Sequence, residues 1–325
     1  MRDPISGIHH ITAIAGDPQR NVDFYAGFLG LRLVKKTVNF DDPGTYHLYF
    51  GDELGHPGTI LTFFPWPGAY RGRRGTGEAA VVSFSVPERS LDFWIRRGRE
   101  HGLTLDGPQT RLSGELFLTL FDPDGLQLEL IGNASRSGGW EDSPVPPEHG
   151  IQGFHGATLA LGRYEPTAEL LTGSFGFRLV EEREDRIRFG APGSGPGAFV
   201  DILRQPDSLR RGMLGAGTDH HIAWRTADDK TQEAWRRHLT ELDYHVTPVM
   251  DRQYFSSIYF REPGGVLFEI ATDPPGFTLD ESPDRLGTAL KLPKWLEPRR
   301  PELERTLPQL EIPANARIHS SLHSC

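Results

Sequence analysis

The chain has 325 residues, which is enough for about two domains with buried cores. Its 35 basic and 44 acidic residues give a net charge of −9, which argues against a nucleic-acid partner or an anionic membrane surface, because both favour a basic protein. No run of about 18 apolar residues is present, so the sequence predicts no membrane helix. A small-molecule substrate is the expected partner, and a homo-oligomer is compatible with the sequence.

The cysteine content and the first residues bear on the cellular compartment. The only cysteine is Cys325, so no internal disulfide can form and a reducing compartment is expected. The opening sequence MRDPISGIHH lacks the apolar segment typical of a signal peptide. The sequence therefore predicts a cytoplasmic protein.

Four similar segments follow one another along the chain. Their first strands are expected at GIHHITAIAGD, EAAVVSFSVPE, GFHGATLALGR and DHHIAWRTADD, where apolar runs end at turns or helix caps. Their last strands are expected after glycine turns, at HPGTILTFF, DPDGLQLELI, GPGAFVDIL and EPGGVLFEIA. A unit of one strand, one helix and three further strands, about 55 residues long, fits each segment.

The first unit shows the pattern in detail. Asp17 can cap a helix whose first position is Pro18, and apolar residues follow at helical spacing up to Gly30. The next strand is expected within LGLRLV at 29–34, which the third unit repeats as FGFRLV at 175–180. This match indicates that the two halves of the chain are related.

Such a unit gives a small sheet with one helix-covered face and one open, curved face, so two sheets must pack together to enclose a cavity. The predicted fold class is α+β, with four βαβββ modules in two pseudo-symmetric domains. The expected domains are residues 1–132 and 153–273, joined by a linker at 133–152 that is rich in Gly, Pro and Ser. Residues 274–325 form an extension beyond the repeat, with one helix expected at about 301–307.

Two histidine pairs and one glutamate carry the clearest chemical signal. They lie on expected strands of the first and fourth units and are His9, His10, His220, His221 and Glu269. Two imidazoles and one carboxylate form a ligand set for non-heme Fe(II) or Mn(II) with open positions. Adjacent strand residues point to opposite faces, so one histidine of each pair is expected to face the cavity, and we favour His10 and His221.

Equivalent positions of the four units can be compared directly. The position on the first strands holds His10, Ala80, His155 and His221, and the position on the last strands holds Thr62, Glu129, Asp201 and Glu269. The first and fourth units together supply three ligands, because the threonine is too weak a donor to add a fourth. The third and fourth units would supply four, and the second and third would supply a different set of three. Spacing alone does not choose among these pairings.

Five segments of the chain resemble a known family. They are GIHHIT at 7–12, YHLYFGDELGHPGT at 46–59, DHHIAW at 219–224, DRQYFSSIYFREPGGVLFEIATD at 251–273 and LGTALKLPKWLE at 286–297. The chain resembles the vicinal oxygen chelate superfamily and, within it, the hydroquinone ring-cleaving dioxygenases. The resemblance implies an Fe(II)-dependent extradiol-type dioxygenase with O2 as co-substrate, in which Mn(II) or another divalent metal can substitute. It also implies metal ligation by His10, His221 and Glu269, which selects the pairing of the first and fourth units.

The resemblance further implies a set of catalytic residues that line the substrate side of the metal: His9, Thr12, His220, Arg252 and Tyr259. Within this set, Arg252 and Tyr259 are expected to orient the ring, and His9 or His220 to move protons near neutral pH. The segment before Tyr259 is shorter than in the chlorohydroquinone dioxygenase of this family, so the pocket wall is expected to differ there.

Two other classes of function stay open on the same scaffold. A glyoxalase-type isomerase or a thiol transferase would work without oxygen, and it normally has the fourth ligand that Thr62 fails to supply. A non-enzymatic protein that binds or sequesters aromatic compounds would keep its affinity after replacement of Glu269. Phe64 and Trp66 suit a substrate wall and a core equally well. The remaining histidines carry no separate signal, among them His47, His56 and His101.

Overall fold

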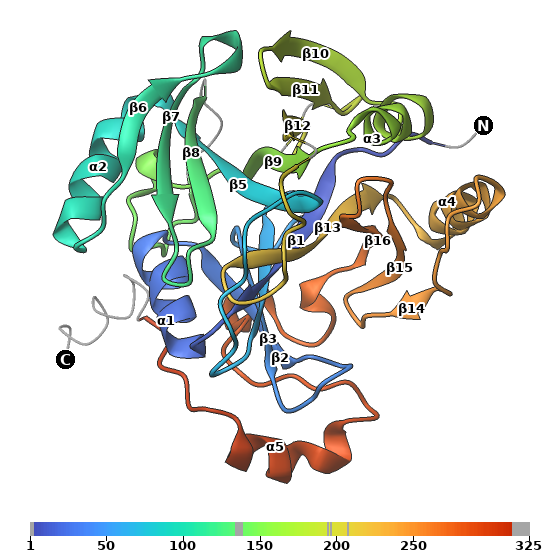
Figure 1. The fold of residues 1–325 in the computed structure, drawn as a ribbon. Helices are drawn as coiled ribbons and strands as arrows, with labels where there is room; N and C mark the ends of the chain where they lie inside the picture. Colours follow the sequence, from blue (N-terminus) through green and yellow to red (C-terminus); the bar gives the residue numbers. More distant parts are fainter. Residues whose placement is uncertain (1–2, 134–138, 194, 196, 207, 314–325) are drawn as a thin grey trace.

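The computed structural model describes residues 3–133, 139–193, 195, 197–206 and 208–313. Part of the expected linker and the end of the C-terminal extension therefore lie outside the described residues. The described chain forms two curved sheets of eight strands each, with helices on their outer faces (Figure 1). None of the helices in these ranges has the length and apolar character that crossing a bilayer requires.

The strands follow the module pattern. Those of the first and second modules are β1 Ile8–Ala15, β2 Arg32–Val38, β3 Tyr46–Gly51, β4 Ile60–Pro65, β5 Glu78–Pro87, β6 Asp106–Thr110, β7 Leu116–Phe121 and β8 Gln127–Asn133. Those of the third and fourth are β9 Phe154–Leu161, β10 Arg178–Arg183, β11 Arg186–Gly190, β12 Phe199–Arg204, β13 Thr218–Thr226, β14 Met250–Asp251, β15 Phe255–Arg261 and β16 Leu267–Pro275. The α-helices are α1 Pro18–Val22, α2 Leu91–Glu100, α3 Glu165–Glu169, α4 Asp229–Glu241 and α5 Arg300–Thr306.

The sheets join modules from different halves of the chain. One sheet has the order β14-β15-β16-β13-β1-β4-β3-β2 and the other the order β10-β11-β12-β9-β5-β8-β7-β6. The first strands of two modules pair antiparallel at each junction, β1 with β13 and β5 with β9. The last strand of each module lies parallel to its own first strand, as β4 does to β1. This topology confirms the α+β fold of four βαβββ modules.

The helices connect other pairs of modules than the sheets do. In the first half, Arg97 of α2 donates from Nε to the Phe28 carbonyl at 2.8 Å, and the Phe28 ring lies 6.1 Å from that of Trp94. In the second half, Phe175 packs against Trp235 of α4 with ring centroids 5.3 Å apart. The sheets thus join the first module to the fourth and the second to the third, whereas the helices contact each other within each half. The division into domains at 1–132 and 153–273 stays a prediction.

The first helix begins where the capping pattern predicts and then changes its type. The Asp17 carboxylate accepts the Arg20 N–H at 2.8 Å, and Pro18 is the first helical residue. From Asp23 to Phe28 the chain continues as a π-helix, a form with a wider turn that the third module repeats at Leu170–Ser174. The apolar side chains at helical spacing are all buried, and they are Val22, Phe24, Tyr25, Phe28 and Leu29.

The C-terminal extension is held against the outer strands of the first module (Figure 1). Lys35 on β2 is fully buried, and its ammonium lies 2.6 Å from Asp280 Oδ1 and 2.5 Å from Glu281 Oε2. The helix α5 lies where the sequence predicts one and buries Leu303. A buried cation with two carboxylates is favourable only while all partners are present. The extension is therefore expected to depend on this contact.

Replacement of Lys35 by alanine should lower the free energy of unfolding by about 3–5 kcal/mol, because the buried Glu281 carboxylate would lose its cation. Lys230→Ala on the exposed side of α4 is the control and should change that free energy by no more than about 0.5 kcal/mol. Urea unfolding followed by tryptophan fluorescence measures both variants. Equal stability of the two would show that this ion pair does not anchor the extension.

Candidate functional site

The pairing of β1 with β13 brings together side chains that are distant in sequence. His10 Nε2 lies 3.4 Å from His221 Nε2, across a separation of 211 positions. Glu269 on the neighbouring β16 completes the group, with Oε2 2.9 Å from His221 Nε2 and 3.4 Å from His10 Nε2. The three ligand atoms lie within 4.8 Å of one another, an arrangement that could hold a metal ion. Among the described residues, this is the group with that geometry.

The surroundings of Glu269 fit a divalent cation. The side chain is fully buried, and its Oε1 accepts the hydroxyl of Ser257, which leaves Oε2 facing the two imidazoles. Burial acts to raise the pKa of this carboxyl, but the imidazoles of His10 and His221 outweigh it and hold the pKa well below its usual range. Burial also lowers the pKa of His221. A buried, ionised carboxylate beside imidazole nitrogens is a donor set that suits a divalent transition metal.

The two histidine pairs lie at β-bulges in the pairing of β1 with β13. The register between the strands skips His9 on one side and His220 on the other. Because a bulge re-aims side chains, the members of each pair touch although they are adjacent in sequence. His9 Nδ1 lies 3.0 Å from His10 Nδ1, and His220 Nδ1 lies 2.8 Å from His221 Nδ1.

These contacts are compatible with the tautomer that metal binding would require of the two candidate ligands. Nε2 of His10 and of His221 must be unprotonated to bind a metal, so Nδ1 carries the proton and donates it to the neighbouring histidine. The neighbours must then be neutral to accept. Burial, followed by the adjacent His10, lowers the pKa of His9 well below its ordinary value, and burial lowers the pKa of His220 to about 3. With a metal bound at both Nε2 atoms, neutral His9 and His220 could accept these hydrogen bonds and orient the two candidate ligands.

The second sheet follows the same plan, and its register corrects the comparison of equivalent positions. The pairing of β5 with β9 skips Ala80 and His155, so these residues correspond to the bulge histidines of the first sheet. The sequence comparison, which placed both at the ligand position, was wrong by one residue because a bulge has no local mark in the sequence. The ligand positions of the second sheet are held by Val81 and Gly156, which offer no donor atom.

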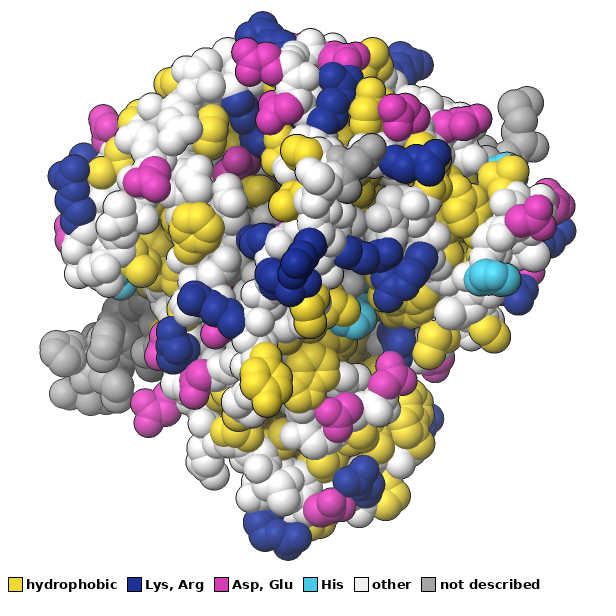
Figure 2. Space-filling model, viewed as in Figure 1, with side chains coloured by type: hydrophobic (Ala, Val, Ile, Leu, Met, Phe, Trp, Pro, Cys, Tyr) yellow, Lys and Arg dark blue, Asp and Glu magenta, His cyan; other side chains and the backbone are white. Residues whose placement is uncertain are grey.

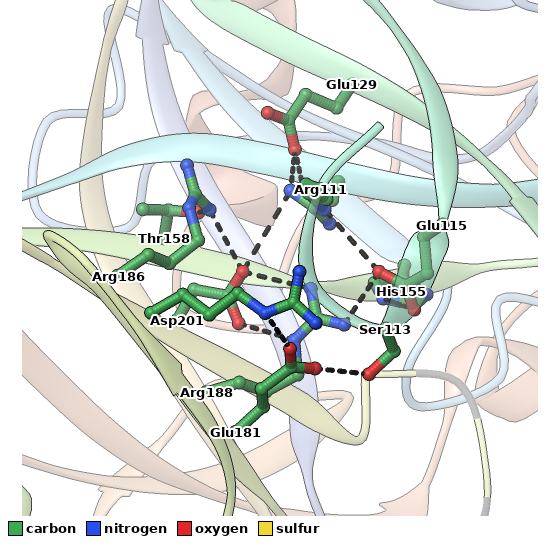
Figure 3. Close-up of polar contacts among 12 residues, drawn as sticks. Arg111, Ser113, Glu115, Glu129, His155, Thr158, Glu181, Arg186, Arg188 and Asp201 are labelled. Carbon is green, nitrogen blue, oxygen red and sulfur yellow. Dashed lines mark hydrogen bonds and ion pairs between the residues drawn. The ribbon is translucent and has the colours of Figure 1, made fainter. Parts of the chain in front are cut away.

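Arginines neutralise the two carboxylates of the second sheet (Figure 3). Asp201 accepts Arg188 Nε at 2.8 Å and Nη2 at 3.0 Å, and Arg186 Nη1 at 2.9 Å. Glu129 accepts Arg111 Nη1. The guanidinium groups thus supply the positive charge that a metal ion would otherwise bring. A metal site built from the second and third modules is therefore excluded. A site from the third and fourth modules is excluded as well, because those modules lie in different sheets.

A cavity of about 290 Å³ opens beside the candidate ligands. Much of its wall is aromatic, with Phe40, Tyr49, Phe64, Trp66, Phe255 and Tyr259 among the lining residues. Phe64 and Trp66, for which the sequence left a core role open, therefore face the cavity. The volume suits one substituted ring, since an apolar cavity of about 150 Å³ already holds benzene.

Arg252 and Tyr259 lie together in the wall of this cavity. Arg252 donates from Nε to the Tyr259 hydroxyl at 3.2 Å, and its Nη1 lies 3.1 Å from Asp41 Oδ2. Burial raises the pKa of Tyr259, and the nearby Glu269 carboxylate raises it further, so the phenol stays protonated. Burial alone would lower the pKa of Arg252, but Tyr259 and Asp41 raise it above the ordinary value. The cavity thus contains a neutral hydroxyl donor beside a fixed cation.

Two expected residues lie behind the wall, and one unexpected residue lies in it. His9 and Thr12 are buried and are not among the residues that line the cavity, and Thr12 Oγ1 lies 2.9 Å from Thr62 Oγ1. His47, to which the sequence analysis gave no role, does line it. Its Nε2 lies 2.8 Å from Thr62 Oγ1, and its Nδ1 lies 2.9 Å from the Tyr49 hydroxyl. The only signal in the sequence for this position was the alternation of side chains along a strand, which places His47 on the same face as Tyr49.

Ser257→Ala should weaken metal binding by about 10- to 100-fold, because the Glu269 carboxylate would lose the hydroxyl that fixes its orientation. Competition with a chelator for Mn(II) or Zn(II) measures the affinity without requiring turnover. Ser256→Ala is the matched control, since its side chain points to the other face of β15. Equal metal affinity of the two variants would show that this hydrogen bond does not support the ligand.

Comparisons with known proteins identify the family. The sequence model of the Glyoxalase/Bleomycin resistance protein/Dioxygenase superfamily matches residues 7–130 and 153–270. MhqO of Bacillus subtilis (strain 168), assigned as a ring-cleaving dioxygenase, is 48% identical over 315 residues, which are 96% of this chain and 99% of the relative. The chlorohydroquinone/hydroquinone 1,2-dioxygenase of Sphingobium indicum is 38% identical over 318 residues, which are 94% of this chain and 97% of the relative.

Solved structures share the fold. The crystal structure of a Bacillus subtilis protein assigned as a dioxygenase has a TM-score of 0.92 at 47% identity, over 96% of this chain and 99% of that one. Glyoxalase I from Zea mays has a TM-score of 0.61 at 16% identity, over 82% of this chain and 92% of that one. This likeness shows the shared fold alone. The relatives support an enzyme rather than a binding protein. The chain belongs to the glyoxalase/bleomycin resistance protein/dioxygenase superfamily, and its relatives there include ring-cleaving dioxygenases.

Proposed function

We propose that the protein is an Fe(II)-dependent, extradiol-type dioxygenase that cleaves the ring of hydroquinones. The observation that carries the proposal is the convergence of His10, His221 and Glu269 beside an aromatic cavity. The substrate class is supported by a relative that is named as a chlorohydroquinone/hydroquinone 1,2-dioxygenase. Bound by these three residues, Fe(II) would supply open positions for dioxygen and one ring hydroxyl and would allow electrons to pass between them.

The three ligands favour an anionic oxygen of the substrate. Two neutral imidazoles and one carboxylate compensate one charge of a divalent ion, so one positive charge remains to stabilise a phenolate. Thr62 occupies the position of a fourth ligand, where its hydroxyl contacts His47 and Thr12. A hydroxyl held in this way is a poor ligand, which keeps coordination positions open. This feature favours a dioxygenase over a glyoxalase-type isomerase.

The cavity must orient the ring through groups away from the ligands, because the two hydroxyls of a para-hydroquinone cannot reach the same ion. We assign this role to Arg252 and Tyr259, whose contact holds both in the wall. The protonated Tyr259 hydroxyl can donate to a ring oxygen, and the guanidinium stabilises negative charge there. Phe64, Trp66 and Phe255 exclude water around the ring.

Anaerobic addition of Fe(II) to metal-free protein, followed by oxygen uptake with methylhydroquinone, tests the proposal. The native sequence should take up oxygen, and Glu269→Gln should lose metal affinity and uptake together, because one charged ligand is removed. Glu129→Gln, the equivalent carboxylate of the second sheet, should keep both, since its partner is Arg111 rather than a metal.

Other outcomes would support the competing classes of function. Absence of oxygen uptake across a panel of hydroquinones would defeat the dioxygenase proposal. Turnover of a substrate under nitrogen with Ni(II) or Zn(II) would indicate an isomerase or a transferase. Tight binding of an aromatic compound that survives Glu269→Gln would indicate a binding protein.

Arg252→Lys should lower kcat/KM for methylhydroquinone by about 10- to 100-fold and leave metal affinity unchanged, because lysine cannot hold Tyr259 and the substrate with the same fork of donors. Arg237→Lys on the exposed side of α4 is the control, since it makes the same exchange away from the cavity. Steady-state oxygen uptake and chelator competition separate the two effects. An unchanged kcat/KM in the lysine variant would remove Arg252 from the reaction.

A further inference from the structure

A second cavity, of about 390 Å³, adjoins the candidate metal centre. It shares His220, His221 and Leu267 with the aromatic cavity, so the two meet at these side chains. Its remaining walls come from two connecting loops, from the turn between β15 and β16, and from residues at the ends of β5, β13 and β15. The proposed reaction gives this space no role.

The two loops connect the sheets, and they are rich in arginine although the whole chain is acidic. They comprise residues 66–77 and 208–217, and they are hydrogen-bonded to each other between Arg73 N–H and Met213 O at 3.0 Å and between Met213 N–H and Arg73 O at 2.8 Å. The chain has a net charge of −9, yet these loops contain Arg71, Arg73, Arg74, Arg210 and Arg211. Figure 2 shows basic side chains gathered at the centre of one face, beside a hollow in which a histidine is visible.

Two guanidinium groups of the cavity converge on one backbone oxygen. Arg211 donates from Nη2 to the Gly265 carbonyl at 2.9 Å, and Arg261 donates from Nη1 to the same oxygen at 3.0 Å. Gly265 permits this approach, because a Cβ there would lie 2.0 Å from Arg211 Nη2. Neither arginine forms an ion pair with an acidic residue in the part of the chain that the structure describes. Two adjacent cations without a counterion favour binding of an anion.

Glu78 and Asp219 are the acidic residues that line the same cavity. Glu78 is already engaged, since it accepts the Gly75 N–H at 3.1 Å and lies 3.7 Å from Arg74. Asp219 is only 4% exposed and is adjacent to His220 in sequence, and within the described residues neither of its oxygens has a hydrogen-bond partner. The cavity therefore contains two arginines without acidic partners among the described residues, whereas the oxygens of Asp219 are buried beneath its wall.

Ring cleavage would create the kind of ligand that such a cavity fits. A hydroquinone and dioxygen combine with the loss of one ring carbon–carbon bond and the oxygen–oxygen bond. One oxygen atom enters each new chain end, which gives a carboxylic acid at the carbon that bore the hydroxyl and an aldehyde at its neighbour. The acid releases its proton at neutral pH, so an uncharged substrate becomes an anion. The second hydroxyl of the hydroquinone survives the reaction.

We propose that this cavity is a product-binding site, in which Arg211 and Arg261 bind the carboxylate of the ring-opened acid. Planar guanidinium groups match a carboxylate through paired hydrogen bonds. The site lies on the other side of His220, His221 and Leu267 from the aromatic cavity. The identity of the ligand rests on the proposed function, whereas the anion site rests on the arginines alone.

Calorimetric titration of the Mn(II)-loaded protein with cis,cis-muconate, a six-carbon dicarboxylate, tests this proposal. Arg211→Gln and Arg261→Gln should each weaken muconate binding by about tenfold, because each removes a charge-assisted contact. Arg211→Lys keeps the charge and should retain part of the affinity. Arg210→Gln is the matched control: it removes an exposed arginine of the same loop that does not line the cavity, and it should change the affinity less than about twofold.

Two results would overturn the proposal. One is an unchanged muconate affinity in both glutamine variants, with melting temperatures that show they are folded. The other is a loss of kcat/KM for 2,5-dihydroxybenzoate in these variants without weaker muconate binding, which would assign the arginines to a carboxylated substrate. Because the titration needs no turnover, a failure of oxygen uptake with hydroquinones would count against the proposed function and not against the anion site.

Discussion

The antiparallel contact between β1 and β13 is the interaction on which the site depends. It closes one sheet from the two ends of the repeat and brings His10 within 3.4 Å of His221, while β16 adds Glu269 from the next strand. The same contact creates the bulges that turn His9 and His220 against the ligands. The grouping of the three candidate ligands and their contacts with the adjacent histidines are therefore consequences of one strand pairing.

The second sheet shows that repetition of a scaffold does not repeat its chemistry. It has the same strand order, the same bulges and two carboxylates at the equivalent positions of its last strands. Valine and glycine replace the imidazoles there, and Arg111, Arg186 and Arg188 supply the positive charge that a metal would otherwise bring. The charge balance of a buried carboxylate is satisfied in both sheets, by different means.

The environment of the histidine pair on β13 differs between its two cavities. The aromatic cavity has ring walls and a single cation, Arg252, which is tied to Tyr259 and Asp41. The second cavity has arginines that lack acidic partners in the described residues and a buried carboxyl group without hydrogen bonds. One space suits an uncharged ring and the other a small acid. In the proposed reaction, the uncharged substrate would bind in the aromatic cavity, and the anionic product would bind in the arginine-lined cavity that adjoins it.

The sequence by itself determined the modules, because strand alternation, the Asp17 cap and glycine turns are local signals. The three candidate ligands followed from the resemblance to a family, since spacing alone did not choose among the pairings. The sequence could not determine which modules share a sheet, since that choice depends on packing between segments 211 positions apart. Only the tertiary structure revealed the bulges, which correct the positions of Ala80 and His155. It also placed His47 in the cavity wall and set arginines against Glu129 and Asp201. Bulges and long-range contacts arise from strand register, which neighbouring residues in the sequence do not specify.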